Sequence, residues 1–205
     1  MTEKQKMLSS KLYDISDEEL VKQYNKTRRL VRAFNATPDT NVKKKGKILK
    51  QLIPNFGEDS LMMAPVQFDY GVNTTVGKGC HFNYNLTVLD CGPVHIADDV
   101  FIGPNCTLAT PIHPMLHEER KAKHKEDGTK YDLEYAKPIV LEEGVWLASN
   151  VVVCGGVTIG KHSVIGAGSV VTRDIPEGVF AAGNPCRVIR EITPNDSVYN
   201  KKELF

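Results

Sequence analysis

The sequence contains no apolar run that approaches the roughly 18 residues a membrane-spanning helix requires. Residues 1–14 are polar and charged, and they lack the apolar segment of a signal peptide. Cysteine is scarce as well. The five cysteines are odd in number, scattered and free of any C-x-x-C pair, which leaves little support for a disulfide framework or a structural zinc site. We therefore expect a cytoplasmic protein, in a reducing compartment, with no bound metal.

Net charge is also nearly absent. Lysine and arginine total 26 against 25 aspartate and glutamate residues, a net charge of +1. The sequence therefore offers no general electrostatic reason to bind nucleic acid or a membrane. Hydrophobic residues make up 41% and charged residues 25% of the 205 residues, which is typical of a globular protein and not of a disordered one. The length predicts one domain, or one domain with an appendage.

An aliphatic residue recurs every six positions from residue 141 onward. Four positions after each of these comes a second residue that is small or β-branched, and shorter stretches of the same signature occur upstream. The first series is Leu141, Leu147, Val153, Ile159, Ile165 and Val171, and the second is Val145, Val151, Val157, Ser163, Ser169 and Ile175. This period fits neither an α-helix nor a simple hairpin, and it predicts a parallel β-helix with a narrow aliphatic core. Several ordinary buried strands would not explain the constant spacing.

Two segments fall outside the repeat. Residues 1–60 predict helices, because Ser16 to Glu19 have the pattern of a capping box and apolar side chains follow at helical spacing. Residues 110–138 are strongly charged, and an insertion of this length in a compact repeat is either a functional loop or a disordered one. The chain therefore divides into a helical segment 1–60, a β-helix 61–192 that carries the loop 110–138, and a tail 193–205.

Five motifs together resemble those of the hexapeptide-repeat acetyltransferases, and within them the maltose and galactoside O-acetyltransferase group. They are DYGVN at 69–73, HP at 113–114, YAKPI at 135–139, GVW at 144–146, and the stretch 156–192 with IGAGSVVTRDIP and AAGNPCRVIREI. The resemblance implies an all-β core folded as a left-handed parallel β-helix, an exception to right-handed crossovers. It also implies a homotrimer with active sites between subunits, acetyl-CoA as the acetyl donor, and a sugar hydroxyl as the acceptor.

Acetyl transfer to a hydroxyl needs a base, and histidine is the usual choice near neutral pH. Among the six histidines, His113 lies where the repeat breaks, and Pro114 biases it toward an extended backbone. From the residues alone, a loop histidine with no role in catalysis remains the alternative. The resemblance matches His113 to the catalytic base of the family. It implies direct transfer, in which the deprotonated hydroxyl attacks the thioester and a backbone N–H near Ser149 stabilises the oxyanion.

The resemblance also implies a set of acceptor-binding residues. Asp69 matches an acceptor-side position, where a carboxylate can accept hydrogen bonds from two sugar hydroxyls, and Asn83 matches a position near both substrates. His81 stands where relatives often carry an aromatic residue, and contact with the sugar and simple space filling are equal alternatives for it. Asp14 matches loosely, with an exposed acid as the alternative. Asp90 is a further candidate that faces the same pocket.

For coenzyme A, the repeat offers a groove between stacked coils. A small residue there permits close approach, and three arginines supply positive charge for phosphates, although a solvated surface arginine is the alternative for any one of them. The residues that the resemblance implies for coenzyme A are Asn83, Trp146, Ser149, Ala167, Thr172, Arg173, Arg187 and Arg190.

Two other functions stay open at this point. The first keeps the fold and the donor but acetylates a hydroxylated xenobiotic, and the resemblance of residues 1–60 to the sugar group argues against it. The second is a non-catalytic β-helix that acts as a scaffold, against which His113 and the three arginines argue. The loop after His113 is longer and more charged than in the sugar acetyltransferases, so the identity of the acceptor stays open.

Overall fold

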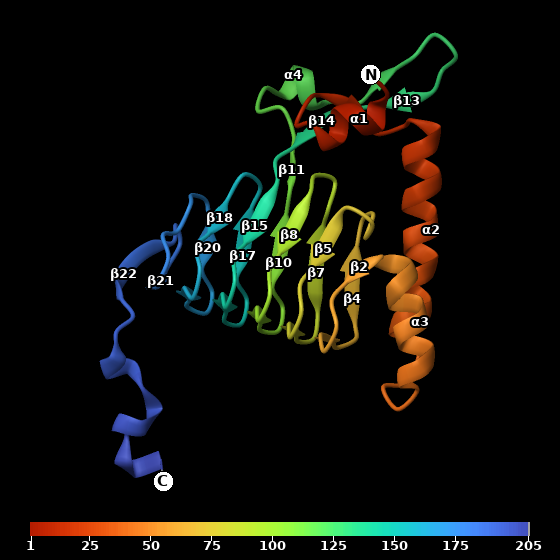
Figure 1. Cartoon of the computed structure of the whole chain (residues 1–205). Helices are drawn as coiled ribbons and strands as arrows, with labels where there is room; N and C mark the ends of the chain where they lie inside the picture. The colour runs from red at the N-terminus through yellow and green to blue at the C-terminus, as the bar shows by residue number, and fades with distance from the viewer. Residues whose placement is uncertain (205) are drawn as a thin grey trace.

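The computed structural model describes residues 1–204, and most of them form a β-helix with three flat sides (Figure 1). Each turn of the chain adds one short parallel strand to each of three sheets. The first sheet contains β2 (Asn55–Phe56), β5 (Thr74–Val76), β8 (Val94–Ile96), β15 (Ile139–Leu141) and β18 (Thr158–Ile159). The third contains β4 (Val66–Phe68), β7 (Leu86–Leu89), β10 (Thr107–Ala109), β17 (Val152–Cys154) and β20 (Val170–Val171).

The second sheet is the longest, because it ends in an antiparallel pair. Its strands are β3 (Leu61–Met62), β6 (His81–Phe82), β9 (Phe101–Ile102), β16 (Trp146–Leu147), β19 (Val164–Ile165), β21 (Val179–Ala182) and β22 (Arg187–Glu191). After β22 the chain leaves the β-helix through three exposed 3₁₀ turns at Pro194–Asp196, Val198–Asn200 and Lys202–Leu204. The sides recur in the order first, second, third, and so three kinds of corner join them.

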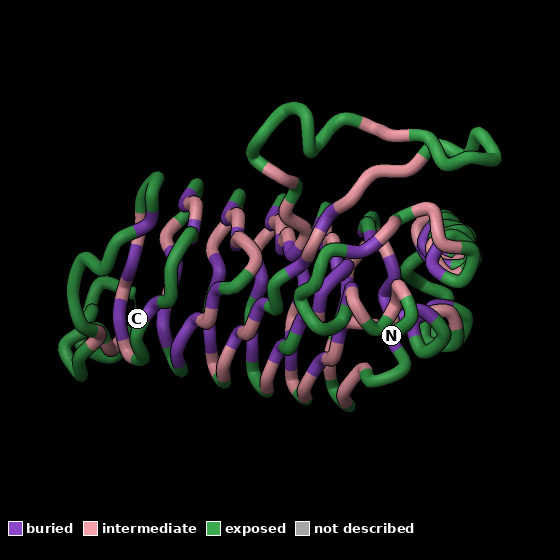
Figure 2. Tube along the Cα trace, turned by 90° about the horizontal axis from the view of Figure 1, so that it is seen from above, coloured by how far each residue is buried: buried purple, intermediate pink, exposed green. Residues whose placement is uncertain are grey.

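The aliphatic residues of the six-residue period fill the interior. Leu141, Leu147, Val153 and Ile165 are fully buried, and the second series from Val145 to Ile175 is buried as well. Figure 2 shows the buried stretches recurring along the stacked coils, with exposed stretches between them. The predicted parallel β-helix is confirmed, since one inward side chain per side is the arrangement that this period requires.

Helices α2 (Glu18–Asn35) and α3 (Val42–Leu52) cap one end of the β-helix (Figure 1), and Phe34 and Leu52 belong to the same buried cluster as the β-helix core. The short helix α1 (Glu3–Leu8) lies beside β14 of the loop. The predicted capping box at Ser16 is wrong by one position. The carboxylate of Asp17 caps α2 by accepting hydrogen bonds from two backbone N–H groups of the first turn.

The loop 110–138 has regular structure. It contains β11 (Pro111–Ile112), α4 (His117–Arg120), β12 (Lys123–His124), β13 (Lys130–Tyr131) and β14 (Leu133–Ala136), and it protrudes from the β-helix (Figure 2). Its strand β14 lies between β11 and β1 (Tyr13–Asp14) in a three-stranded antiparallel sheet. The loop is therefore fixed to the N-terminal segment, which lies about 120 residues away in the chain. Within residues 1–204, no helix has both the length and the apolar character needed to cross a bilayer.

Candidate functional site

A cavity of about 460 Å³ lies where α2, the corners after the third sheet and the loop meet. Helix α2 and the segment before it supply one wall, which is largely apolar. The corners after β4, β7 and β10 supply the opposite wall. We call this cavity the acceptor pocket, after the role that the sequence predicts for Asp69. It is lined by Ile15, Leu20, Val21, Tyr24, Asp69, Tyr70, Leu89, Cys91, Pro111, His113 and Glu134. Two of the sequence-predicted residues, His113 and Asp69, therefore share one cavity.

His113 follows directly after β11, at the point where the chain leaves the β-helix. Its imidazole is half exposed, and Nε2 lies 3.5 Å from Oε2 of Glu134 on the paired strand β14. A carboxylate beside one ring nitrogen orients the imidazole and leaves the other nitrogen available to accept a proton. The geometry thus suits a general base that can reach a hydroxyl bound in the pocket.

Glu134 is a residue of this site that the sequence analysis did not identify. It is 8% exposed, and its Oε1 accepts a hydrogen bond from the phenol of Tyr13, its cross-strand neighbour in β1. Tyr13 is itself buried, and burial strongly raises the pKa of its phenol, which therefore stays a proton donor. In β14 the buried residues are Glu134 and Ala136, whereas an apolar–polar alternation in the sequence would place Leu133 and Tyr135 inward, so no sequence signal reveals this inward-facing carboxylate.

Asp69 faces the pocket from the corner after β4. Burial, together with the nearby carboxylate of Asp90, raises the pKa of Asp69 to about 6. The thiol of Cys91 lies 3.6 Å from Oδ2 of Asp69, and burial strongly raises the pKa of that thiol too. The pocket thus holds a carboxylate whose charge is poorly compensated by the protein and a cysteine that stays protonated.

Asp90 does not occupy the place that the sequence analysis predicts for it. It is completely buried, and its carboxylate accepts hydrogen bonds from the Tyr70 backbone N–H at 2.8 Å and from the Thr74 hydroxyl at 3.0 Å. Both oxygens are used inside the corner that follows β4. Asp90 therefore fixes the backbone of Tyr70 and is corrected from an acceptor ligand to a structural residue.

Asp14 joins the N-terminal segment to the loop and does not line the pocket. Its Oδ2 lies 2.6 Å from Nζ of Lys125, and its Oδ1 accepts hydrogen bonds from the backbone N–H and hydroxyl of Ser16. Partial burial would raise the pKa of Asp14, but the hydrogen bonds from Lys125 and Ser16 outweigh it and lower the pKa. Asp14 thus holds the loop over the pocket.

The other predicted residues on the second sheet lie away from this pocket. His81, Trp146 and Asn83 are absent from its lining, and so is Ser149, which follows β16. His81 stacks on Phe101 with ring centres 5.8 Å apart. In register along the outer face of the sheet stand Leu61, His81, Phe101 and Trp146, of which Leu61, Phe101 and Trp146 are each about half exposed. This row of four residues, which we call the outer-face row, lies on a different side of the β-helix from His113.

The residues predicted for the far end of coenzyme A are all exposed. Ala167, Thr172 and Arg173 lie at corners of the last coil, and Arg187 lies in β22. Arg190 differs from the expectation, because Asp196 accepts two hydrogen bonds from its guanidinium, at 2.6 and 2.8 Å. These contacts lower the pKa of Asp196 to about 2. The charge of Arg190 is therefore already paired within the chain, whereas Arg187 donates to the Cys186 carbonyl and has no ion pair among residues 1–204.

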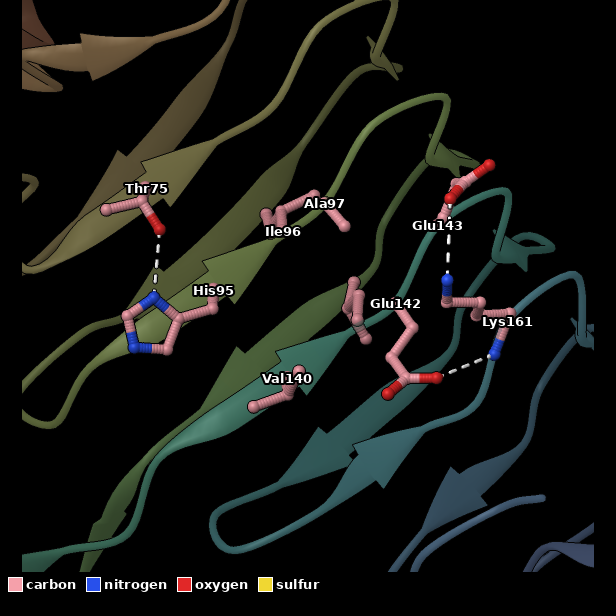
Figure 3. Close-up of a pocket in the computed structure, with 9 residues that line it drawn as sticks. Thr75, His95, Ile96, Ala97, Val140, Glu142, Glu143 and Lys161 are labelled. Atoms are coloured by element: carbon pink, nitrogen blue, oxygen red, sulfur yellow. Dashed lines mark hydrogen bonds and ion pairs between the residues drawn. The ribbon is translucent and has the colours of Figure 1, made fainter. Parts of the chain in front are cut away.

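A second depression, of about 340 Å³, lies on the outer face of the first sheet (Figure 3). His95 points outward there, as the sequence predicts, and its Nδ1 lies 2.9 Å from the hydroxyl of Thr75. At the other end, the carboxylate of Glu142 accepts a hydrogen bond from the backbone N–H of Lys161. The depression includes none of the residues of the acceptor pocket, and we assign it no catalytic role.

Metal and disulfide chemistry find no support in residues 1–204. No group of three or more His, Cys, Asp or Glu side chains gathers there as metal ligands. All five cysteines are free thiols.

Two family descriptions match parts of the sequence. Residues 6–57 match the maltose acetyltransferase hexapeptide capping motif, and residues 138–173 match six repeats of the bacterial transferase hexapeptide. The first match includes α2, the helix that lines the acceptor pocket, and the second covers the regular part of the β-helix.

Similar proteins cover almost the whole chain. The galactoside O-acetyltransferase of Escherichia coli K12 is 41% identical over 99% of this chain and 95% of its own length. A galactoside acetyltransferase solved in complex with coenzyme A has a TM-score of 0.87 and 39% identity, over 96% of this chain and 94% of that one. A maltose O-acetyltransferase from Clostridium difficile 630 has a TM-score of 0.83 and 38% identity, over 94% and 98%. This agreement confirms the left-handed form of the β-helix.

Proposed function

The chain belongs to the maltose and galactoside O-acetyltransferase group of the hexapeptide-repeat acetyltransferases, and from this we propose that it transfers acetyl from acetyl-CoA to a sugar hydroxyl. The observation that carries the proposal is the acceptor pocket, in which His113 stands beside Glu134 and shares the cavity with Asp69. An imidazole and a carboxylate are the groups that a hydroxyl acceptor needs for deprotonation and for binding.

In the proposed reaction, the free nitrogen of His113 takes the proton of the bound hydroxyl. The hydroxyl oxygen then attacks the thioester carbonyl, and a tetrahedral intermediate forms whose oxyanion is stabilised by a backbone N–H near Ser149. Collapse of the intermediate breaks the carbon–sulfur bond, and the imidazolium returns its proton to the departing thiolate. The products are the sugar acetate and coenzyme A, and the enzyme is regenerated without a covalent intermediate.

Direct transfer is favoured over an acyl-enzyme by the state of Cys91. It is the cysteine that lines the pocket, and burial raises its pKa, so it holds little of the thiolate that attack on a thioester requires. The role of Glu134 in this reaction is to support His113 as the base. Its carboxylate faces the imidazole on one side and the Tyr13 phenol on the other, so it fixes the ring and stabilises the imidazolium that forms during transfer.

We propose further that the active site is completed by a neighbouring subunit in a homotrimer. Within one chain, His113 lies at a corner between the third and first sheets, whereas Trp146 and Ser149 belong to the second sheet and its far corner. The outer-face row of Leu61, His81, Phe101 and Trp146 forms a largely apolar strip on that face. Such a strip suits burial against a second copy and a slender coenzyme arm.

Coenzyme A carries phosphates, and the exposed Arg173 and Arg187 have no acidic partner among residues 1–204. They would bind these phosphates, while Trp146 and Ala167 line the path of the pantetheine arm. Ala167 has only a methyl group at an exposed corner, so the chain leaves room for close approach there.

The experiment that tests the proposed function is release of free thiol from acetyl-CoA by the purified protein. The acceptor panel contains maltose, a galactoside, glucose and a chloramphenicol-like alcohol, and mass spectrometry identifies the acetylated product. We expect thiol release and a single added acetyl group with sugars. Thiol release that occurs with the xenobiotic but with none of the sugars overturns the proposal, and so does the absence of thiol release with every acceptor of the panel.

A further inference from the structure

A third cavity, of about 240 Å³, lies beside the acceptor pocket along α2, and we call it the α2 groove. Its walls are α2 on one side and the end of β4 on the other. It is lined by Arg28, Val31, Arg32, Asn35, Gln67 and Phe68. The acceptor pocket is bounded by the preceding turns of the same helix and by Asp69 and Tyr70, the residues that follow Phe68. The two cavities therefore lie next to each other between α2 and residues 67–70, and we call this space, with both cavities, the trough.

Arg28 stands at the junction of the two cavities. Its guanidinium carbon lies 5.5 Å from the centre of the Tyr24 ring, and Tyr24 lines the acceptor pocket. Tyr24 in turn packs edge-on against Tyr70, with ring centres 6.2 Å apart. The guanidinium is thus held over an aromatic ring, within reach of a ligand that extends out of the acceptor pocket.

The two ends of the trough carry opposite charge. The acceptor pocket contains the carboxylates of Asp69 and Glu134, whereas no acidic side chain lines the α2 groove. None of the ion pairs within residues 1–204 involves Arg28 or Arg32. Asn35 is fixed, because its side chain bonds the backbone N–H and C=O of Val66. Two unpaired guanidinium groups beside a fixed wall suit an oxyanion.

We propose that the α2 groove is a second acceptor subsite, in which Arg28 and Arg32 bind a carboxylate, sulfate or phosphate carried by the sugar whose hydroxyl faces His113. This inference rests on the proposed sugar acetyltransferase function. From Tyr24 to Arg32 the helix rises by about 12 Å at 1.5 Å per residue, a distance that a disaccharide can span. The acid at one end and the arginines at the other would orient such an acceptor with its neutral end toward the base.

The test compares methyl maltoside with maltose 1-phosphate, which share both sugar rings and differ in the group on the anomeric oxygen. We expect wild-type kcat/KM to be about three- to tenfold higher for the phosphate, because charge-assisted hydrogen bonds add to binding. Arg28→Gln and Arg32→Gln should each reduce this preference toward one, mainly through KM. Arg29→Gln is the matched control, since Arg29 is exposed on the same helix and lines neither cavity.

Calorimetric titration with maltose 1-phosphate gives a readout independent of turnover. Binding that weakens in Arg32→Gln but not in Arg29→Gln, and that weakens as salt is raised, supports the subsite. Equal kcat/KM for the two acceptors in the wild type, together with equal affinity in both variants, overturns the inference and leaves the acetyltransferase proposal intact. Failure to acetylate methyl maltoside or any other sugar counts against the acetyltransferase proposal itself.

Discussion

Glu134 lies between Tyr13 and His113, accepting a hydrogen bond from the phenol with one carboxylate oxygen and facing the imidazole at 3.5 Å with the other. The contact joins the N-terminal segment, the loop and His113 into one unit through the strand pair β1–β14. The orientation of the imidazole therefore depends on residues far apart in the chain.

Replacement of the base has the largest predicted effect. His113→Ala should lower kcat by about 10²- to 10⁴-fold, the usual contribution of general-base catalysis, while coenzyme A binding stays nearly unchanged. Steady-state kinetics and a coenzyme A titration measure the two quantities. His95→Ala is the control, because His95 points outward on the first sheet and lies outside the pocket. A His113 variant with wild-type kcat would remove this residue from the mechanism.

Glu134→Gln keeps an oxygen for the Tyr13 phenol but removes the charge beside His113. We expect kcat to fall by about tenfold or more, yet less than on loss of the base itself, with little change in KM for acetyl-CoA or in the melting temperature. Tyr13→Phe should give a smaller loss of kcat, since the carboxylate remains. If kcat and KM were both unchanged in Glu134→Gln, the residue would serve the fold alone.

The carboxylate of Asp69 should make stability depend on pH. Its pKa is raised to about 6 in the folded chain, above the ordinary value near 3.8, so the unfolded chain loses this proton first. The raised pKa therefore lowers the free energy of unfolding above pH 6, and this destabilisation fades as the pH falls toward 4. Asp69→Asn should raise the free energy of unfolding by no more than about 3 kcal/mol at pH 7.5, and the gain should shrink toward pH 4. Denaturant titrations at the two pH values measure it, and a gain independent of pH contradicts the assignment.

The pairing of Arg190 with Asp196 predicts unequal roles for the two arginines of β22. Arg187→Ala should raise KM for acetyl-CoA several-fold in a salt-sensitive way, because a free cation is lost. Arg190→Ala should have a weaker effect, since Asp196 already neutralises that guanidinium. Asp196→Asn should lower KM. A higher KM in Asp196→Asn would mean that the pair supports the fold near the coenzyme.

Mixing inactive variants tests the shared active site. His113→Ala and Trp146→Ala damage opposite halves of the proposed site, so mixed trimers contain some sites with both halves intact. Activity should reappear when the two proteins are unfolded together and refolded, and light scattering should give a trimer mass. A wild-type protein that runs as a monomer, or a mixture that stays inactive while trimers form, rules out the shared site.

The core was predictable from sequence because its signal is local and periodic. Each residue from Leu141 to Val171 at six-residue spacing faces the interior, so the period itself encodes burial. His113 stands at the break of that period, but its proposed role as the base comes from the family resemblance. Such signals need no knowledge of distant partners.

Glu134 and Asp90 show where sequence reasoning ended. The carboxylate of Glu134 accepts a hydrogen bond from Tyr13, and no local pattern links a loop residue to a strand 121 positions earlier. A carboxylate at a corner of the β-helix can point outward or inward, and at Asp90 the hydrogen bonds from Tyr70 and Thr74, which the sequence does not reveal, hold it inward. Arg190 was expected to be free because its partner lies in a tail with no periodic signal.

The strand pair β1–β14 also limits how this scaffold can acquire new acceptors. One wall of the pocket comes from the first 35 residues, and the edge with His113 and Glu134 comes from an insertion a hundred residues later, so swapping either piece alone between homologues would exchange only one side of the β1–β14 pair. Chimeras that change specificity should succeed when both pieces are inherited from the same parent.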